Sequence, residues 1–134
     1  MTTVSEQQLL PSAEPVCLID QYGVPHENPP YELPARETLL DGYTQLIKGR
    51  RFNEQASALV RQGRLAVYPS SFGQEACQIA ATMVLREGDW LFPTYRDSVS
   101  IMSRGVDPIE TLTLLRGDWH SGYDTYEHKV APQS

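Results

Sequence analysis

The chain has 134 residues, a length that suits a single domain with a modest hydrophobic core. Hydrophobic residues make up 40% of it and charged residues 21%, the balance of a globular protein rather than of a disordered or membrane-spanning chain. The formal net charge of −6 argues against a nucleic-acid or membrane-surface binder, because both roles need clustered Lys and Arg.

The N-terminus and the cysteines indicate a cellular compartment. Residues 1–6 lack the basic start and the apolar stretch of a signal peptide, and no later apolar run is long enough to cross a bilayer. The two cysteines, Cys17 and Cys77, form no Cys-x-x-Cys pair, which suits a reducing environment without a disulfide framework. We therefore expect a cytoplasmic protein.

Residues 1–34 are predicted to form an extended arm, because they hold more than half of the chain's ten prolines. Within this arm, residues 16–19 are a candidate short strand, and residues 21–23 are a candidate turn that ends it. Composition leaves two interpretations open, an arm docked on a neighbour and a flexible tail.

A long helix is predicted from about residue 34 to residue 62, with Pro34 and Glu37 in its first turn and Gly63 after its end. Its apolar residues change face near the middle, so the helix is expected to touch two surfaces. The first face holds Leu39, Leu40, Tyr43, Leu46 and Ile47, and the second holds Phe52, Ala56, Leu59 and Val60.

Small residues recur at a heptad spacing along this helix, at Gly42, Gly49, Ala56 and Gly63. Such a line lets another backbone approach closely. The alternative is that the glycines are tolerated defects that cost about 1 kcal/mol each relative to Ala.

Residues 65–68 are predicted to form a short extended segment that ends at Pro69. A second helix should follow, with Ser71 and Gln74 in capping-box spacing and Gly88 just beyond its end. Residues 76–85 are apolar nearly all the way round, which predicts a buried helix with Cys77 as a small core residue.

Residues 90–92 are predicted to form a short strand that stops at Pro93, and Thr94 and Asp97 have the spacing of a helix start. The third helix should end at Gly105. A fourth helix should begin with Asp107, Pro108 and Glu110 and end at Gly117, followed by a polar and aromatic loop to residue 134.

The junction at residues 94–96 is the strongest candidate site. Ligands of open α/β sheets bind beyond the carboxyl ends of the strands, where free N–H groups and the helix dipole attract anions. Arg96 would add a bidentate clamp on a phosphate, so the junction predicts a diphosphate pocket. In the alternative interpretation Arg96 pairs with Asp97 or Asp89, and Tyr95 packs in the core.

Other constellations are weaker. His120 lies near Asp118 and Asp124, but no second histidine has ligand spacing, so a metal or general-base role is poorly supported. A nucleophilic pair of Cys77 and His120 would need an exposed thiol, whereas the helix pattern buries it.

Three stretches together resemble the alpha subunits of thiamine-diphosphate-dependent pyruvate and branched-chain 2-oxo acid dehydrogenases. They are residues 68–76 (YPSSFGQEA), residues 88–97 (GDWLFPTYRD) and residues 104–108 (RGVDP), and the likeness spans roughly residues 35–134. It implies an α/β thiamine-diphosphate-binding fold, of which residues 35–134 would be an incomplete N-terminal part, mostly helical with short strands.

The resemblance also implies site residues. Tyr95 and Arg96 would contact thiamine diphosphate, with the arginine on the diphosphate and Thr94 beside them. Ser134 would open a segment that helps to bind a monovalent cation. The family's Gly-Asp-Gly motif, which holds the Mg²⁺ that bridges the diphosphate, is not in this sequence, so we expect no divalent metal site and no catalytic residue within these 134 residues.

The activity implied is oxidative decarboxylation of a 2-oxo acid, with the acyl group passed to a lipoyl acyltransferase component. The resemblance implies a beta subunit as partner in a heterotetramer, and we expect the isolated chain to be inactive. Some pyruvate-type members carry a histidine where this chain has residues 69–71, so the substrate is pyruvate or, alternatively, a branched-chain 2-oxo acid. Two further alternatives are a non-catalytic subunit-binding module and an unrelated helical protein.

Overall fold

The structure is a computed structural model that describes residues 15–27, 31–118, 120 and 122–133. Contacts divide the chain into two compact units, Met1–Ala35 and Arg36–Ser134. In the first unit, the described residues form a tight turn in which Asp20 Oδ1 accepts hydrogen bonds from the N–H groups of Tyr22 and Val24. A single antiparallel bridge pairs Ile19 with Pro25, so the predicted turn is present but the predicted strand is reduced to one bridge.

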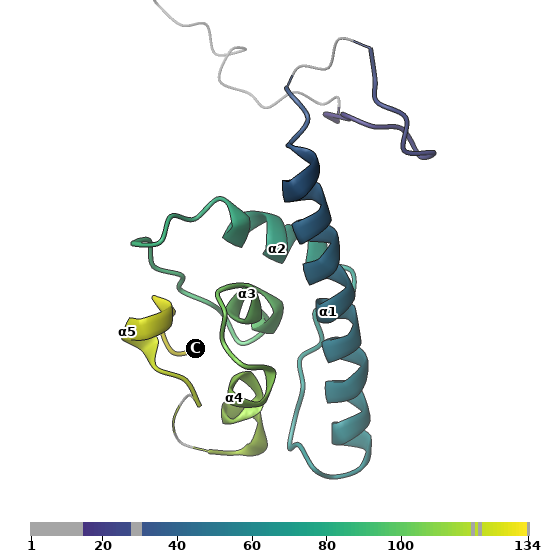
Figure 1. Cartoon of the computed structure of the whole chain (residues 1–134). Helices are drawn as coiled ribbons and strands as arrows, with labels where there is room; N and C mark the ends of the chain where they lie inside the picture. The colour runs from purple at the N-terminus through teal and green to yellow at the C-terminus, as the bar shows by residue number, and fades with distance from the viewer. Residues whose placement is uncertain (1–14, 28–30, 119, 121, 134) are drawn as a thin grey trace, which may run out of the picture. The chain divides into compact units, whose positions relative to one another are not determined.

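The second unit is built mainly from helices (Figure 1). The longest is α1 (Arg36–Arg61), and the others are α2 (Glu75–Met83), α3 (Ser98–Ser103), α4 (Pro108–Leu112) and α5 (Thr125–His128), with a 3₁₀ turn, η2 (Leu114–Arg116), after α4. The predicted long helix is confirmed to within about two residues at each end. No helix in the described part of the chain has the length and apolar character needed to cross a membrane.

The α3 helix lies at the centre of this unit and contacts α1, α2 and α4. The apolar cluster that includes Ile101 continues through Val106 and Tyr123 to Val130. Leu91 packs against this cluster and forms a parallel bridge with Val130, in which the N–H of Leu91 donates to the carbonyl of Lys129 at 2.8 Å. In the described part of the chain, the strand predicted for residues 90–92 is reduced to this bridge.

Two glycines of α1 lie close to side chains of neighbouring helices, whereas their spacing predicts the close approach of another backbone. A Cβ atom placed on Gly49 would lie 2.9 Å from Cγ1 of Val99 in α3, and one placed on Gly42 would lie 3.3 Å from Sδ of Met83 in α2. Ala56 is fully buried. Gly63 has a different role, because its φ of +69° ends the helix in the left-handed region.

The two predicted faces of α1 have different environments. On the second face, Phe52 and Ala56 are buried. On the first face, Leu39, Tyr43 and Ile47 are each more than half exposed, so within the described residues most of this face is uncovered.

The second helix, α2, differs from its prediction in its start, its end and its burial. It begins at Glu75, and Ser71 makes no side-chain cap because its hydroxyl donates to Asn53 instead. It ends at Met83, well before Gly88. It buries the polar face of Glu75, Gln78 and Thr82 with Ile79, whereas Cys77 is exposed, so the prediction of Cys77 as a core residue is wrong for this structure.

The last two predicted segments are partly confirmed. Asp107 caps α4 by accepting a hydrogen bond from the N–H of Ile109 at 2.7 Å, and Gly117 (φ +105°) ends the η2 turn. The predicted loop after Gly117 contains a short helix instead. Asp124 caps this α5 helix by accepting from the N–H groups of Tyr126 and Glu127.

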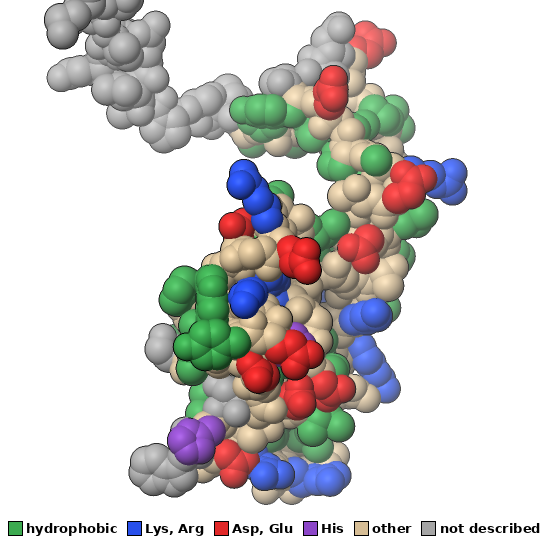
Figure 2. All heavy atoms as spheres, turned by 60° about the vertical axis from the view of Figure 1, so that its left-hand side comes forward, with side chains coloured by type: hydrophobic (Ala, Val, Ile, Leu, Met, Phe, Trp, Pro, Cys, Tyr) green, Lys and Arg blue, Asp and Glu red, His purple; other side chains and the backbone are tan. Residues whose placement is uncertain are grey.

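Exposed hydrophobic side chains reach the surface in patches, and carboxylates gather between them (Figure 2). The most exposed hydrophobic residues of the second unit lie on different elements: Tyr43, Val84, Phe92, Ile109 and Tyr126. The surface is therefore not uniformly polar. A mostly helical unit is confirmed, while the α/β sheet expected from the resemblance is not seen in the described residues.

Candidate functional site

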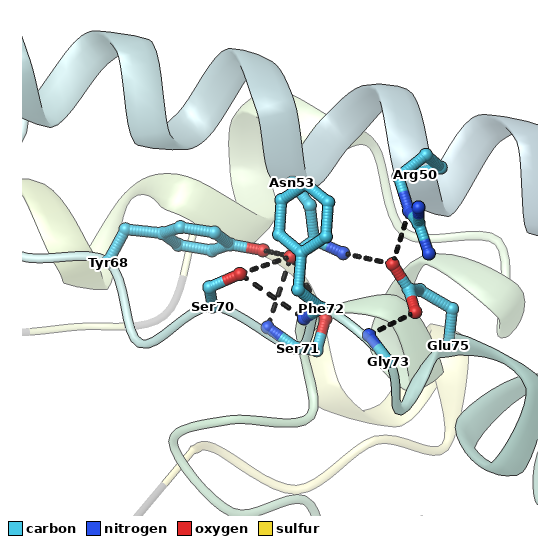
Figure 3. A network of polar contacts seen from close by, with 8 residues as sticks. All are labelled: Arg50, Asn53, Tyr68, Ser70, Ser71, Phe72, Gly73 and Glu75. Carbon is cyan, nitrogen blue, oxygen red and sulfur yellow. Dashed lines mark hydrogen bonds and ion pairs between the residues drawn. The ribbon is translucent and has the colours of Figure 1, made fainter.

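The candidate site is built on a buried asparagine of α1. Asn53 lies one residue from Phe52 on the buried face of the helix, and its side chain is fully buried. Its Oδ1 atom accepts hydrogen bonds from the hydroxyl of Tyr68, from the N–H and hydroxyl of Ser71, both at 3.1 Å, and more weakly from the hydroxyl of Ser70 at 3.3 Å (Figure 3). Asn53 therefore anchors the segment that leads into α2.

Glu75, the first residue of α2, completes this network from the other side. Its Oε1 atom accepts from Nδ2 of Asn53 at 3.2 Å and from Nε of Arg50 at 2.8 Å, and its Oε2 atom accepts from the N–H of Gly73 at 2.7 Å (Figure 3). The guanidinium of Arg50 also lies 4.7 Å from the ring centre of Phe72. The polar groups at the start of α2 are thus fixed by α1.

The network shifts the pKa values of Glu75 and Tyr68 in opposite directions. Burial raises the pKa of Glu75, but the ion pair with Arg50 and the N–H bonds outweigh it, so the carboxylate has a lowered pKa. Burial raises the pKa of Tyr68 to about 12, and the nearby negative charge of Glu75 acts in the same direction. At neutral pH the network therefore holds an ionised glutamate beside a neutral tyrosine.

Arg96 joins this network through the backbone of Ser70. Its Nη1 atom donates to the Ser70 carbonyl at 2.8 Å, and its own carbonyl accepts from Nε2 of Gln78 at 3.2 Å. The guanidinium carbon lies 5.5 Å from the ring centre of Tyr95, a cation–π contact. Tyr95 is about half exposed, so these two side chains lie together at the surface.

The alternative partners predicted for Arg96 are engaged elsewhere. Asp97 accepts from the N–H and hydroxyl of Thr94, at 2.8 and 2.7 Å, and Asp89 accepts from the N–H of Arg86. None of the ion pairs between described residues includes Arg96. Tyr95 is not packed in the core either.

The backbone around Arg96 differs from the predicted helix start. The α3 helix begins at Ser98 rather than at Thr94, and it is a short helix of six residues. The N–H of Thr94 is already bonded to Asp97. The N–H of Thr94 is therefore not free to bind an anion, and the cationic group at the site is the guanidinium of Arg96.

The remaining predicted site residues do not converge on Arg96. Asp118 pairs with Arg116, Asp124 caps α5, and His120 is exposed. No group of three metal-ligating side chains forms within the described parts of the chain. Ser134, the candidate for a monovalent cation, lies outside the described residues.

The sequence prediction missed the Asn53 network altogether. One signal was present, because Asn53 is a polar residue between two members of the apolar stripe, Phe52 and Ala56. A polar side chain on a buried helix face must find hydrogen-bond partners, and the serines and the tyrosine of residues 68–71 supply them.

Comparison with known proteins gives a consistent set of relatives. Residues 43–131 match a family described as "Dehydrogenase E1 component". The chain is 38% identical over 123 residues to the 3-methyl-2-oxobutanoate dehydrogenase subunit alpha of Mycobacterium tuberculosis, an overlap that covers 90% of this chain and 33% of that protein.

Two further relatives differ in the substrate that their names state. The pyruvate dehydrogenase E1 component subunit alpha of Acholeplasma laidlawii is 38% identical over 96 residues, which covers 71% of this chain and 27% of that protein. The 2-oxoisovalerate dehydrogenase subunit alpha of Pseudomonas aeruginosa is 37% identical over 81 residues, which covers 60% and 20% respectively. The chain thus spans about a third or less of the length of these curated relatives.

Proposed function

Because the chain belongs to the dehydrogenase E1 component family, we propose that it is the part of a 2-oxo acid dehydrogenase alpha subunit that contacts thiamine diphosphate through Tyr95 and Arg96. Thr94 lies beside this pair and fixes the turn that carries it. The match covers most of the second unit, which includes both the Asn53 network and Arg96.

The state of the Arg96 guanidinium carries this proposal. Only Nη1 donates to another group of the described residues, the Ser70 carbonyl, and no carboxylate neutralises the charge. Nε and Nη2 remain to donate to a phosphate oxygen, and charge-assisted bonds from a guanidinium to phosphate are among the strongest that proteins make. The exposed phenol of Tyr95 lies next to the same position.

Each residue of the site has a separate task. Arg96 binds the anion, Tyr95 supplies a ring and a hydroxyl at its edge, and the turn closed by Asp97 and Thr94 keeps the two side chains together. When bound, thiamine diphosphate supplies the carbanion chemistry that removes carbon dioxide from a 2-oxo acid. The Gly-Asp-Gly motif that the resemblance assigns to Mg²⁺ is not among these 134 residues, so we propose no ligand for that ion here.

The proposed substrate is a 2-oxo acid, and the named relatives include both a pyruvate enzyme and branched-chain enzymes. The proposed partners are a beta subunit and a lipoyl acyltransferase component. The binding-module alternative loses its main support, because Gly42 and Gly49 pack against Met83 and Val99 of this same chain.

The direct test is a calorimetric titration of the 134-residue chain with thiamine diphosphate. We expect weak binding, roughly millimolar, since one guanidinium and one phenol make few contacts. Arg96→Ala should weaken binding at least about tenfold, the loss expected for a charge-assisted hydrogen bond. Arg61→Ala, which removes an exposed arginine at the end of α1, is the matched control and should leave binding unchanged.

Activity is tested by mixing the chain with a 2-oxo acid dehydrogenase beta subunit and measuring carbon dioxide release from pyruvate and from 3-methyl-2-oxobutanoate.

In the titration with thiamine diphosphate, equal binding by Arg96→Ala and wild type would rule out the proposed cofactor contact. Co-purification with the beta subunit, without cofactor binding, would instead favour the non-catalytic module.

A further inference from the structure

We propose that Asn53 is a positioning residue for Arg96, acting through the peptide unit that joins Ser70 to Ser71. This inference deepens the proposed function and rests on it, because it assigns Asn53 the task of orienting the cation that would bind the diphosphate. Asn53 itself touches no ligand, since it is fully buried in α1.

The two ends of one peptide unit carry the argument. The N–H of Ser71 donates to Oδ1 of Asn53 at 3.1 Å, and the carbonyl of Ser70 accepts from Nη1 of Arg96 at 2.8 Å. These two groups belong to the same planar trans peptide, in which N–H and C=O point in opposite directions. By fixing the N–H, Asn53 directs the carbonyl toward Arg96.

The bond to Asn53 is supported on both sides. The hydroxyl of Ser71 donates to the same oxygen at 3.1 Å, and the amide nitrogen of Asn53 donates to Glu75 at 3.2 Å, which sets the orientation of the side-chain amide. An amide oxygen has two lone pairs, and here donors from Tyr68, Ser70 and Ser71 all lie within hydrogen-bond distance of it, so this part of the chain gathers around one buried acceptor.

Arg96 is held at a second point, which makes its side-chain direction depend on the Ser70 carbonyl. Its backbone carbonyl accepts from Gln78, and Gln78 in turn accepts from the N–H of Ser100 at 3.3 Å. With the backbone fixed by α2 and α3, the hydrogen bond to Ser70 selects which guanidinium nitrogens remain free. Asn53 thereby influences ligand contact without approaching the ligand.

The experiment measures the binding of inorganic diphosphate to the 134-residue chain and to its variants. Asn53→Leu removes the acceptor at nearly constant size and should weaken binding roughly tenfold, the cost of misplacing one charge-assisted hydrogen bond. Tyr68→Phe is the matched control, because it removes another donor to Oδ1 but keeps the bond to the peptide N–H. It should change the affinity less than about twofold while lowering stability.

A double-mutant cycle separates positioning from a general loss of structure. If Asn53 acts through Arg96, Asn53→Leu should have almost no effect on the residual diphosphate binding of Arg96→Ala. An equal loss in both backgrounds would overturn the proposal.

Nuclear magnetic resonance of the Arg96 side chain gives a readout that needs no ligand. In the wild type, the bond to Ser70 should slow rotation of the guanidinium and give resolved Nη signals, and a single averaged signal would overturn the proposal even if Asn53→Leu did not fold. Wild-type chain that shows resolved signals but binds no diphosphate would contradict the proposed function and leave the positioning role standing.

Discussion

Glu75 is the residue on which solution conditions should act most directly. Its carboxylate is almost fully buried, yet it stays ionised because Arg50, Asn53 and the N–H of Gly73 all donate to it. Its pKa in the folded chain is lowered, whereas an unfolded glutamate has a pKa of about 4.3. Folding therefore favours the ionised form.

We predict that the contribution of Glu75 to stability is complete above the unfolded pKa and is lost as the pH falls through the lower, folded pKa. Glu75→Gln should be less stable than wild type at pH 7 by about 1–3 kcal/mol, the range for a hydrogen-bonded buried charge. The difference should shrink below about pH 4, where wild type also loses the charge. Urea unfolding between pH 3 and pH 7 measures both effects.

Glu54→Gln is the control for this titration, because Glu54 is exposed and forms a 3.6 Å pair with Arg51. Exposed pairs contribute little, so this variant should stay within about 0.5 kcal/mol of wild type at every pH. A difference in the free energy of unfolding between Glu75→Gln and wild type that stayed constant down to pH 3 would show that the charge of Glu75 is not the source of the stability.

At the scale of elements, the two helical glycines of α1 should respond in opposite directions to alanine. Both gain up to about 1 kcal/mol of helix propensity from the change. At Gly49 the new Cβ would lie 2.9 Å from Val99, a buried and stiff β-branched side chain, so Gly49→Ala should be destabilising by about 1–3 kcal/mol.

Gly42→Ala places its Cβ 3.3 Å from the sulfur of Met83, which is a flexible side chain that can move aside. We predict that this variant is as stable as wild type or more stable, by up to about 1 kcal/mol. Thermal unfolding followed by circular dichroism compares the two variants directly. Equal destabilisation at both positions would mean that α1 does not pack more tightly against α3 than against α2.

The helix caps give a further prediction at this scale. Asp107 accepts from the N–H of Ile109 at the start of α4, so Asp107→Ala should lower the free energy of unfolding by about 1 kcal/mol. Asp107→Asn keeps an acceptor and should cost much less. If the two variants lost the same amount of stability in urea unfolding, the side-chain cap would not be the cause.

The elements that the sequence predicts well are those with local signals. The proline, the cap and the glycines that bound the predicted helices act within one or two turns, so α1 and the start of α4 are confirmed, whereas α4 ends at Leu112 and Gly117 ends the η2 turn. The start of α2 could not be predicted locally, because the Ser71 hydroxyl has a competing partner in Asn53, which is distant in sequence. The short α5 did have a local signal, Asp124 followed by Glu127 in capping-box spacing, which the loop interpretation overlooked.

The candidate site shows the same division between local and distant effects. The motif predicts Tyr95 and Arg96 as cofactor contacts, and that role remains a prediction, supported by a guanidinium that forms no ion pair with any described residue. The contact between Arg96 and the Ser70 carbonyl could not be predicted from the sequence, because it joins a side chain to the backbone across 26 positions. A backbone carbonyl carries no residue-type signal.

At the scale of the whole molecule, the described residues bury almost as many polar side chains as hydrophobic ones. Large apolar side chains such as Val84, Phe92 and Ile109 remain more than three-quarters exposed. Burial of apolar surface is the main favourable term in folding, and a chain of this size can bury only a limited amount of it. Hydrogen-bonded polar groups specify the arrangement but add only about 1 kcal/mol each.

We therefore predict that the 134-residue chain is marginally stable, with a free energy of unfolding at or below about 5 kcal/mol. It should also bind a hydrophobic dye such as ANS under native conditions, because its apolar patches are exposed. Urea unfolding gives the first quantity and dye fluorescence the second. Adding a beta subunit should raise the unfolding midpoint and reduce dye binding if these patches are interaction surfaces, since a partner that binds only the folded state stabilises it by mass action. A stability near 10 kcal/mol without dye binding would instead mean that the polar network and the small apolar cluster around Ile101 suffice to hold the fold by themselves.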